Sequence, residues 1–393
     1  VLVKTQNLKV AGRSSSFKFR NNEVDLKTIG EQLDVEHILE GSIRKDSNRI
    51  RITAQLITAS DGFHLWSESY DRELTDIFAI QDEIAGAITS ALAIELELAD
   101  GAQTLVTVST GNMEAYDHYL EAKGLIARRV DFPRAIALLK EATDLDPDFA
   151  PGWATAAQAY SLGIYYDPSI DRDEYLANAE TMAHKALAID PGLSMAHSVL
   201  GDIYRDRNEW VKADESYLHA LSLNPDNIEA NEQYAQMLWR ASYFEEALGY
   251  SGKASDLDPL SWLNLTVHAA LRYVSGDLEG GWDEMQRALR IGGNNRYFAL
   301  RHALNMSISE GNIEKATEYM QAISNSSRDD SFKPRSQEQL AQILPLVGSR
   351  GELLDYLRAN YARPSSGEVD GAWATDLFWA CLLYTSDAAD DEY

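Results

Sequence analysis

The chain has 393 residues, enough for two or more domains, and 45% of them are hydrophobic, as in a globular protein. Its 62 Asp and Glu residues against 35 Lys and Arg give a net charge of -27, which argues against a nucleic-acid partner, because phosphate binding needs clustered positive charge. No apolar run approaches the roughly 20 residues that cross a bilayer, so we expect a soluble region without membrane contact, and the single cysteine, Cys381, excludes an internal disulfide.

Residues 1–97 are expected to form a small α+β domain. Leu26, Ile29 and Leu33 share one face of a predicted helix, after which the period of the apolar residues changes to two. In residues 49–58 apolar and polar residues alternate, as a strand with one buried face requires. Similar strands are expected on either side, over 36–44 and 63–70, which completes an antiparallel meander. A long helix capped by Thr75 is expected to close the domain.

Residues 10–88 resemble the TolB amino-terminal-like domain of bacterial multidomain proteins along nearly its full length. That family begins with a further strand and a helix before the position of Val1, so we expect a domain that is truncated at its N-terminus. In the family, this domain precedes tetratricopeptide repeats and follows a class III nucleotide cyclase domain or a winged-helix DNA-binding domain, often across one membrane helix. The resemblance therefore implies a sensor or scaffold region of a signalling protein.

A repeated proline pattern follows a predicted linker over residues 98–112. Each proline comes after an apolar residue and an Asp or Asn: Pro147, Pro191, Pro225 and Pro259. An alanine stands twelve residues before each proline and another five before it: Ala135, Ala142, Ala179, Ala186, Ala213, Ala220, Ala247 and Ala254. Small residues at fixed positions let helix backbones approach closely, and proline ends a helix. The spacing of 34 residues between the last three prolines predicts an array of helix pairs.

The residues after two of these prolines resemble the tetratricopeptide repeat family. Trp153 and Tyr160 follow Pro147, and Gly201 and Tyr204 follow Pro191, at positions of the pattern W-x2-L-G-x2-Y. The resemblance implies an all-α superhelix, an α-solenoid, over residues 113–323. We expect four clear and two divergent units, the clear ones being residues 116–147, 148–191, 192–225 and 226–259. The second unit has ten extra residues, predicted to form a loop between its helices. Asp226 or Asn227 is expected to cap the helix after Pro225.

The family also implies a concave groove, lined by the first helix of each unit, that binds protein or peptide. Carried over by position, the groove-facing residues are Asp202, Arg205, Glu232, Gln236, Trp239 and Tyr273. Solvated charge is the alternative for the charged ones. Trp239 and Tyr273 are candidate partner anchors, because exposed aromatic side chains often carry binding energy, with a place in the helical core as the alternative.

Motifs of catalysis are missing from the sequence. It has no P-loop, no G-x-G-x-x-G, no H-E-x-x-H and no cysteine pair, and no two of its eight histidines are four residues apart. We therefore expect no catalytic residue, no metal site and no cofactor within this chain.

The C-terminal part is expected to hold further helices over residues 324–380. The last segment, 381–393, resembles translated sequencing-adapter read-through, and we expect it to be a non-native tail. The sequence as a whole predicts a non-catalytic protein-binding scaffold or sensor region of a bacterial signalling protein, with the periplasm favoured over the cytoplasm. One alternative is the regulatory part of a class III adenylate or guanylate cyclase whose catalytic domain lies upstream. The other is a scaffold for envelope assembly.

Overall fold

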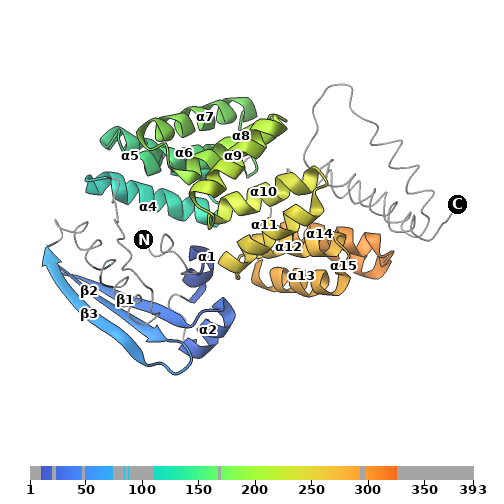
Figure 1. Cartoon of the computed structure of the whole chain (residues 1–393), viewed down its shortest axis with the longest axis horizontal. Coiled ribbons are helices and arrows are strands. Elements are labelled where there is room, and N and C mark those ends of the chain that lie inside the picture. The colour runs from blue at the N-terminus through green and yellow to red at the C-terminus, as the bar shows by residue number, and fades with distance from the viewer. Residues whose placement is uncertain are drawn as a thin grey trace. The chain divides into compact units, whose positions relative to one another are not determined.

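The computed structural model describes residues 10–19, 24–46, 49–73, 84, 87, 110–166, 170–292 and 297–324 (Figure 1). The predicted helix after Thr75, apart from residues 84 and 87, most of the linker, the helices expected beyond residue 324 and the tail 381–393 lie outside the described residues. The chain forms two compact units, one of residues 1–231 with 256–259 and one of residues 232–255 with 260–393. This division falls within a helix, and the expected boundary at residues 98–112 stays a prediction.

A small antiparallel sheet follows the first helices, as the sequence predicts. The short α1 (Arg13–Ser16) and η2 (Phe17–Phe19) lead to α2 (Leu26–Leu33), whose cap Asp25 accepts a hydrogen bond from the Thr28 amide at 2.9 Å. Three strands follow in the order β1 (His37–Asp46), β2 (Arg49–Thr58) and β3 (His64–Glu73). The apolar side of β2 is buried, with Leu56 3% exposed. This α+β arrangement is confirmed, and the resemblance to the TolB-like family stays a prediction.

Twelve helices follow within the described residues and form six consecutive pairs, whose first and second members we call the A helix and the B helix. The pairs are α4 (Met113–Arg128) and α5 (Phe132–Leu145), α6 (Ala150–Gly163) and α7 (Arg172–Ile189), α8 (Ser194–Asp206) and α9 (Trp210–Leu223), α10 (Ile228–Arg240) and α11 (Phe244–Leu257), α12 (Trp262–Val274) and α13 (Leu278–Gly292), and α14 (Tyr297–Ser309) and α15 (Ile313–Ser324). This is the α-solenoid of tetratricopeptide type that the sequence predicts, whereas the division into four clear and two divergent units stays a prediction.

The turn between the A and B helices is the same in five of the six pairs. Each contains a residue in the left-handed backbone region: Arg129, Asn208, Ser242, Gly276 and Gly311, with φ between 58° and 98°. Such a residue stops a helix and lets its last carbonyls find partners. Among the six pairs, the second departs from this turn, since α6 ends at Gly163 and α7 begins only at Arg172. The ten-residue insertion expected from the sequence falls at this connection, part of which lies outside the described residues.

The alanines of the repeat pattern lie at the closest contacts between helices. All eight are buried, seven of them 0% exposed and Ala254 1% exposed. In the fifth pair Gly281 takes the place of the first alanine, and a Cβ added there would lie 2.9 Å from the Ala269 carbonyl oxygen. The backbones of α12 and α13 thus approach too closely for any side chain at this position.

A hydrogen bond to each of three repeat prolines joins the helix pairs to their connecting turns. Trp153 Nε1 donates to the Pro147 carbonyl at 2.8 Å, and Asn231 Nδ2 donates to the Pro225 carbonyl at 3.0 Å. His197 Nε2 lies 3.0 Å from the Pro191 carbonyl, which requires the tautomer protonated at Nε2. All three residues stand six positions after their proline. The half-buried Trp153 ring also carries the Lys185 ammonium 4.2 Å from its centroid.

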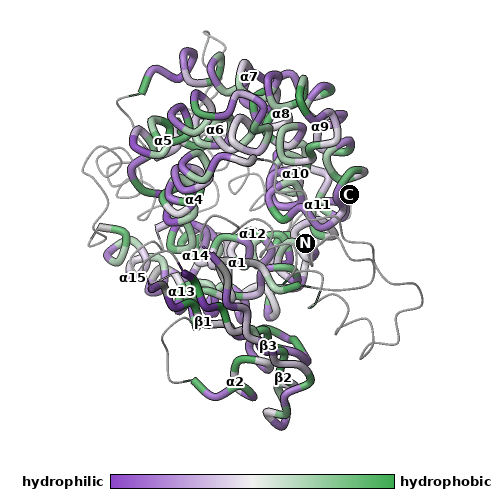
Figure 2. The backbone as a smooth tube through the Cα atoms, turned by 90° about the vertical axis from the view of Figure 1, so that its left-hand side faces the viewer, coloured by the Kyte–Doolittle hydropathy of each residue, from purple (hydrophilic) through white to green (hydrophobic). Residues whose placement is uncertain are grey.

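The helix caps and the helix surfaces follow ordinary rules of helix chemistry. Asn227, and not Asp226, caps α10, because its Oδ1 accepts the Ala230 amide at 3.0 Å. Figure 2 shows hydrophobic and hydrophilic residues interleaved along the helices, as expected of amphipathic helices that each bury one side. No helix in the described part of the chain is long and apolar enough to cross a bilayer.

Successive A helices lie against one another. In the first unit α6 contacts both α4 and α8, and in the second unit α12 contacts α14, whereas the B helices of the same pairs contact each other less. Each unit therefore places its A helices side by side, which brings equivalent positions of neighbouring repeats into line.

We predict that Gly201→Ala destabilises the protein by about 1 to 3 kcal/mol, because an added Cβ would lie 2.8 Å from Cδ1 of the fully buried Tyr217. Gly124→Ala is the matched control, since Gly124 also lies inside a helix but has nothing within 4 Å of the added Cβ. That control should leave stability unchanged or raise it by about 0.4 to 1 kcal/mol. Urea denaturation followed by circular dichroism measures both, and equal effects would contradict the close contact at Gly201.

Candidate functional site

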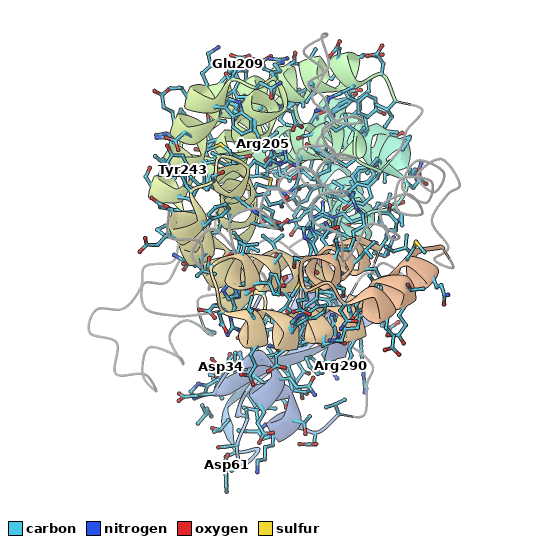
Figure 3. The ribbon with its side chains drawn as sticks, turned by 90° about the vertical axis from the view of Figure 1, so that its right-hand side faces the viewer. Asp34, Asp61, Arg205, Glu209, Tyr243 and Arg290 are labelled. Atoms are coloured by element: carbon cyan, nitrogen blue, oxygen red, sulfur yellow. The ribbon has the colours of Figure 1, made fainter. Side chains whose placement is uncertain are left out.

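The two groove residues predicted on α8 are buried and bound to neighbouring side chains. Asp202 is 7% exposed and Arg205 4%. The Tyr217 hydroxyl, on the B helix of the same pair, donates to Asp202 Oδ1 at 2.6 Å. Arg205 Nη1 lies 3.5 Å from the same oxygen and 3.3 Å from the Tyr217 hydroxyl. In Figure 3 Arg205 lies among the helices, whereas Glu209 lies at their outer edge. Neither side chain is the solvated charge that the sequence left as the alternative, and their place in a partner groove stays a prediction.

The loop inserted in the second pair is bound to the same cluster. The hydroxyl of Tyr165, in that loop, donates to the Asp206 carboxylate at 2.6 Å and lies 3.2 Å from Arg205 Nη2. Arg205 Nε is 3.4 Å from Asp206 Oδ1, and Arg172 Nη2, at the start of α7, is 3.7 Å from Asp206 Oδ2. We call Asp202, Arg205, Asp206, Tyr165 and Tyr217 the α8 cluster. It joins the second and third helix pairs through their polar side chains.

The α8 cluster holds its charges by mutual contact. Burial raises the pKa of Asp202 to about 6, although Arg205 and the Tyr217 hydroxyl act in the opposite direction. Burial alone would lower the pKa of Arg205, but the oxygens of Tyr217, Tyr165 and the two aspartates raise it well above its ordinary value. At pH 7 the carboxylate and the guanidinium are therefore both charged and paired. Such a pair suits a structural contact between repeats better than an open receptor.

The predicted groove residues of the second unit are also mostly buried. Glu232 is 5% exposed and accepts a hydrogen bond from Gln236 Nε2 at 3.1 Å. Gln236 itself is half-buried. Trp239 and Tyr273 are each 7% exposed, so the expectation of exposed aromatic anchors is wrong for both. Their place in the helical core, which the sequence left open, is what the structure shows. A partner along this line of positions stays a prediction.

Contacts far along the chain explain why these aromatic side chains are buried. The Trp239 ring packs on the His302 ring, with centroids 5.3 Å apart, and Phe298 meets His302 edge-on at 4.5 Å. The Tyr273 hydroxyl lies 2.7 Å from Ser309 Oγ and donates to the Met306 carbonyl at 3.3 Å, while burial raises its pKa to about 12. Burial likewise lowers the pKa of His302, which is 3% exposed, to about 3. No spacing in the sequence pairs Trp239 with His302.

The described residues include no group of three or more His, Cys, Asp or Glu side chains arranged to hold a metal ion. His197 and His219 come together as rings 4.3 Å apart, and His268 Nδ1 lies 3.0 Å from Glu284, which makes pairs rather than ligand sets. The chemistry of the described part is therefore that of polar and aromatic contacts between helices.

Comparison with known proteins gives two relatives and a set of similar structures. No protein-family model matches the chain. It is 31% identical over 235 residues to a protein of Rhizobium meliloti (strain 1021) named "Putative adenylate cyclase 3", which covers 58% of this chain and 32% of that protein. It is 27% identical over 130 residues to the cellulose synthase 2 operon protein C of Komagataeibacter xylinus, covering 33% of this chain and 10% of that protein. The chain thus spans about a third or less of these relatives.

Solved structures of repeat proteins align with large parts of the chain at low identity. PilW, a type IV pilus biogenesis factor, is 17% identical, with 56% of this chain and 98% of PilW covered and a TM-score of 0.43. A tetratricopeptide repeat protein of Parabacteroides merdae is 13% identical, with 70% of this chain and 100% of that protein covered and a TM-score of 0.40. With scores this low, the fold assignment rests on the helix pairs of this chain itself.

We predict that Arg205→Met destabilises the protein by about 3 to 5 kcal/mol, because the Asp202 carboxylate then stays buried without its cation and Asp206 keeps only the more distant Arg172. The double variant Arg205→Met with Asp202→Leu should lose less than the sum of its two single variants, since one of the stranded charges is gone. Chemical denaturation measures the free energy of unfolding of the wild type, the two single variants and the double variant.

Lys140→Met is the matched control for the charge change, since the Lys140–Asp144 pair is 2.7 Å long but exposed to solvent. Its effect on stability should be far smaller than that of Arg205→Met. Similar losses at the two sites would mean that the α8 cluster is not buried in solution.

We predict a pH-dependent stability that depends on His302. Because its pKa in the folded protein is about 3, against an ordinary value of 6.5, the unfolded chain takes up this proton first as the pH falls. The stabilisation is therefore complete above the ordinary pKa and is lost as the pH falls from 6.5 towards 3. Between pH 7.5 and pH 5.5 the wild type should lose about 1.4 kcal/mol more than His302→Gln. The exposed His184→Gln should keep the wild-type dependence, and loss of the dependence in that control would place its origin elsewhere.

Proposed function

We propose that this chain is a protein-binding scaffold within a larger bacterial signalling protein, and that it holds an extended partner segment along its A helices. One observation carries this proposal: neighbouring A helices pack side by side, so that equivalent side chains of successive repeats line up. An extended segment can then contact one repeat after another with the same spacing. The described residues include no metal cluster that would support catalysis at this surface.

The accessible side chains at the groove positions are amides. Gln158 and Gln236 stand at the same position of the second and fourth units, and both are half-buried. A side-chain amide donates and accepts at once, which suits the N–H and C=O groups of a peptide backbone. The buried Asp202 stands at this position in the third unit. We therefore expect the partner to be recognised first through its backbone at the glutamines, and through neutral or basic side chains, given the net charge of -27.

A second candidate function is the regulatory part of a nucleotide cyclase. The alignment with the Rhizobium meliloti protein favours it, because it is 31% identical over 58% of this chain and covers only 32% of that protein. A catalytic domain would then belong to a part of the protein other than the aligned region. This candidate function requires that the whole gene product synthesises a cyclic nucleotide. It also requires that deletion of this region changes the rate of that synthesis.

The alternative of an envelope assembly scaffold is favoured by the second relative, which belongs to a cellulose synthase operon and is 27% identical over 130 residues. Identification of the partner distinguishes these roles, because a signalling scaffold would bind a signalling protein, whereas an envelope assembly scaffold would bind an envelope component.

We predict that a photo-crosslinking amino acid placed at Gln158 captures a partner protein in the living bacterium, as does one placed at Gln236, because each position faces the segment proposed along the A helices of its own unit. Glu215, exposed on the B helix α9, is the control position. Mass spectrometry of the crosslinked species identifies the partner. Capture at Glu215 alone, or equal capture at all three positions, would contradict binding along the A helices.

A further inference from the structure

The B helices of the fifth and sixth pairs meet through aromatic side chains. The Trp282 ring, on α13, lies nearly parallel to the Tyr319 ring, on α15, with centroids 6.2 Å apart and planes at 17°. Tyr273, on α12, meets Trp282 edge-on, with centroids 6.4 Å apart and planes at 84°. Gln286 Nε2 donates to the Tyr319 hydroxyl at 2.7 Å and fixes that ring. Trp282 and Tyr319 are only half-buried, so part of this aromatic pair faces solvent.

Carboxylates lie beside the aromatic pair. Trp282 Nε1 donates to Glu310 Oε1 at 2.5 Å, and Glu310 is exposed. Burial raises the pKa of Tyr319, the Gln286 hydrogen bond lowers it, and the charges of Glu318 and Glu310 raise it further. Both carboxylates are thus near enough to disfavour another negative charge at this site. The negative potential of these two carboxylates favours a cation at this site.

A cation of the chain itself already lies on the site. Lys315 Nζ is 4.7 Å from the Trp282 ring centroid, within the distance at which an ammonium is attracted to an aromatic face. Lys315 is four residues before Tyr319 on α15, so both lie on the helix face turned to Trp282. Its side chain is exposed and long, and it can swing away without disturbing the helix.

One lysine does not balance the charge of this surface. Along α15 and the first two turns of α13, the exposed charged side chains are Lys315 and the four acids Glu279, Asp283, Glu314 and Glu318. The sum of these charges is negative, and the exposed Glu310 adds a further negative charge. The surface is therefore complementary to a further positive charge, and the aromatic face is where such a charge gains most.

We propose that Trp282, Tyr319 and Glu310 form a binding site for a lysine or arginine side chain of a partner protein segment, and that Lys315 occupies this site in the absence of the partner. The site lies on B helices and does not depend on binding along the A helices. Lys315 acts as an internal competitor, so that only a segment with its own cation displaces it. Binding at this site therefore selects basic segments over neutral ones.

The test uses isothermal titration calorimetry of the whole chain with an unstructured twelve-residue peptide that repeats lysine, glycine and serine. We expect Lys315→Ala to strengthen binding by about threefold to tenfold, because it removes the competitor. Trp282→Leu should weaken binding by about tenfold or more. The same peptide with acetylated lysines should not bind.

Lys185→Ala is the matched control, because it removes an equal charge from a lysine that lies 4.2 Å from the Trp153 ring centroid in another repeat. It should leave the affinity within about twofold of the wild type, because it removes an equal charge without changing the Trp282–Tyr319 pair or its competitor. Equal strengthening by Lys315→Ala and Lys185→Ala would show general attraction to an acidic protein and overturn the proposal. Because Lys315 is exposed, its variant folds and decides the question even if Trp282→Leu does not fold.

Discussion

The close approach of helix backbones at the buried alanines is the constraint on which the array depends. Because no large side chain stands between the helices there, the backbone carbonyls of these positions come within reach of the next A helix. Ser194 Oγ donates to the Ala220 carbonyl at 2.8 Å, and Asn264 Nδ2 donates to the Ala254 carbonyl at 3.2 Å. The same small residues that permit packing thus also provide the hydrogen bonds that fix one repeat on the next. Gly201 permits close packing in the same way, because the missing side chain there leaves room for the Tyr217 ring.

The buried polar side chains of the A helices limit which groups remain for a partner. Asp202 and Arg205 are used within the α8 cluster, and Tyr273 is used by Ser309 and Met306. These hydrogen bonds and ion pairs join neighbouring helix pairs, and each one fixes the geometry between the pairs that it joins. In the binding mode proposed above, the half-buried glutamines stand on helices that are already ordered before the partner binds. Ordering costs on binding fall mainly on the partner segment.

Local sequence patterns predicted the fold, whereas the burial of side chains that depends on residues far along the chain could not be predicted. The prolines and the alanines each act within a few residues of the chain, so the array of helix pairs followed from the sequence. The burial of Asp202 depends on a tyrosine of the neighbouring B helix, and that of Trp239 on His302, two helix pairs further along. Periodicity places a side chain on a face but does not say what covers that face. The partner groove therefore stays a prediction by position, and the burial of its predicted members depends on contacts that the sequence does not show.

The hydrogen bonds to the proline carbonyls bear on how such repeats are detected. Trp153, His197 and Asn231 differ in size and aromaticity, yet each brings a nitrogen to the carbonyl six residues earlier. What these three repeats share at this position is a donor atom at a given reach rather than a residue type. A search that scores the presence of any side-chain N–H at this offset from a proline would group these three repeats together. Substitution matrices, which treat tryptophan as dissimilar to histidine and asparagine, separate the first of these repeats from the other two.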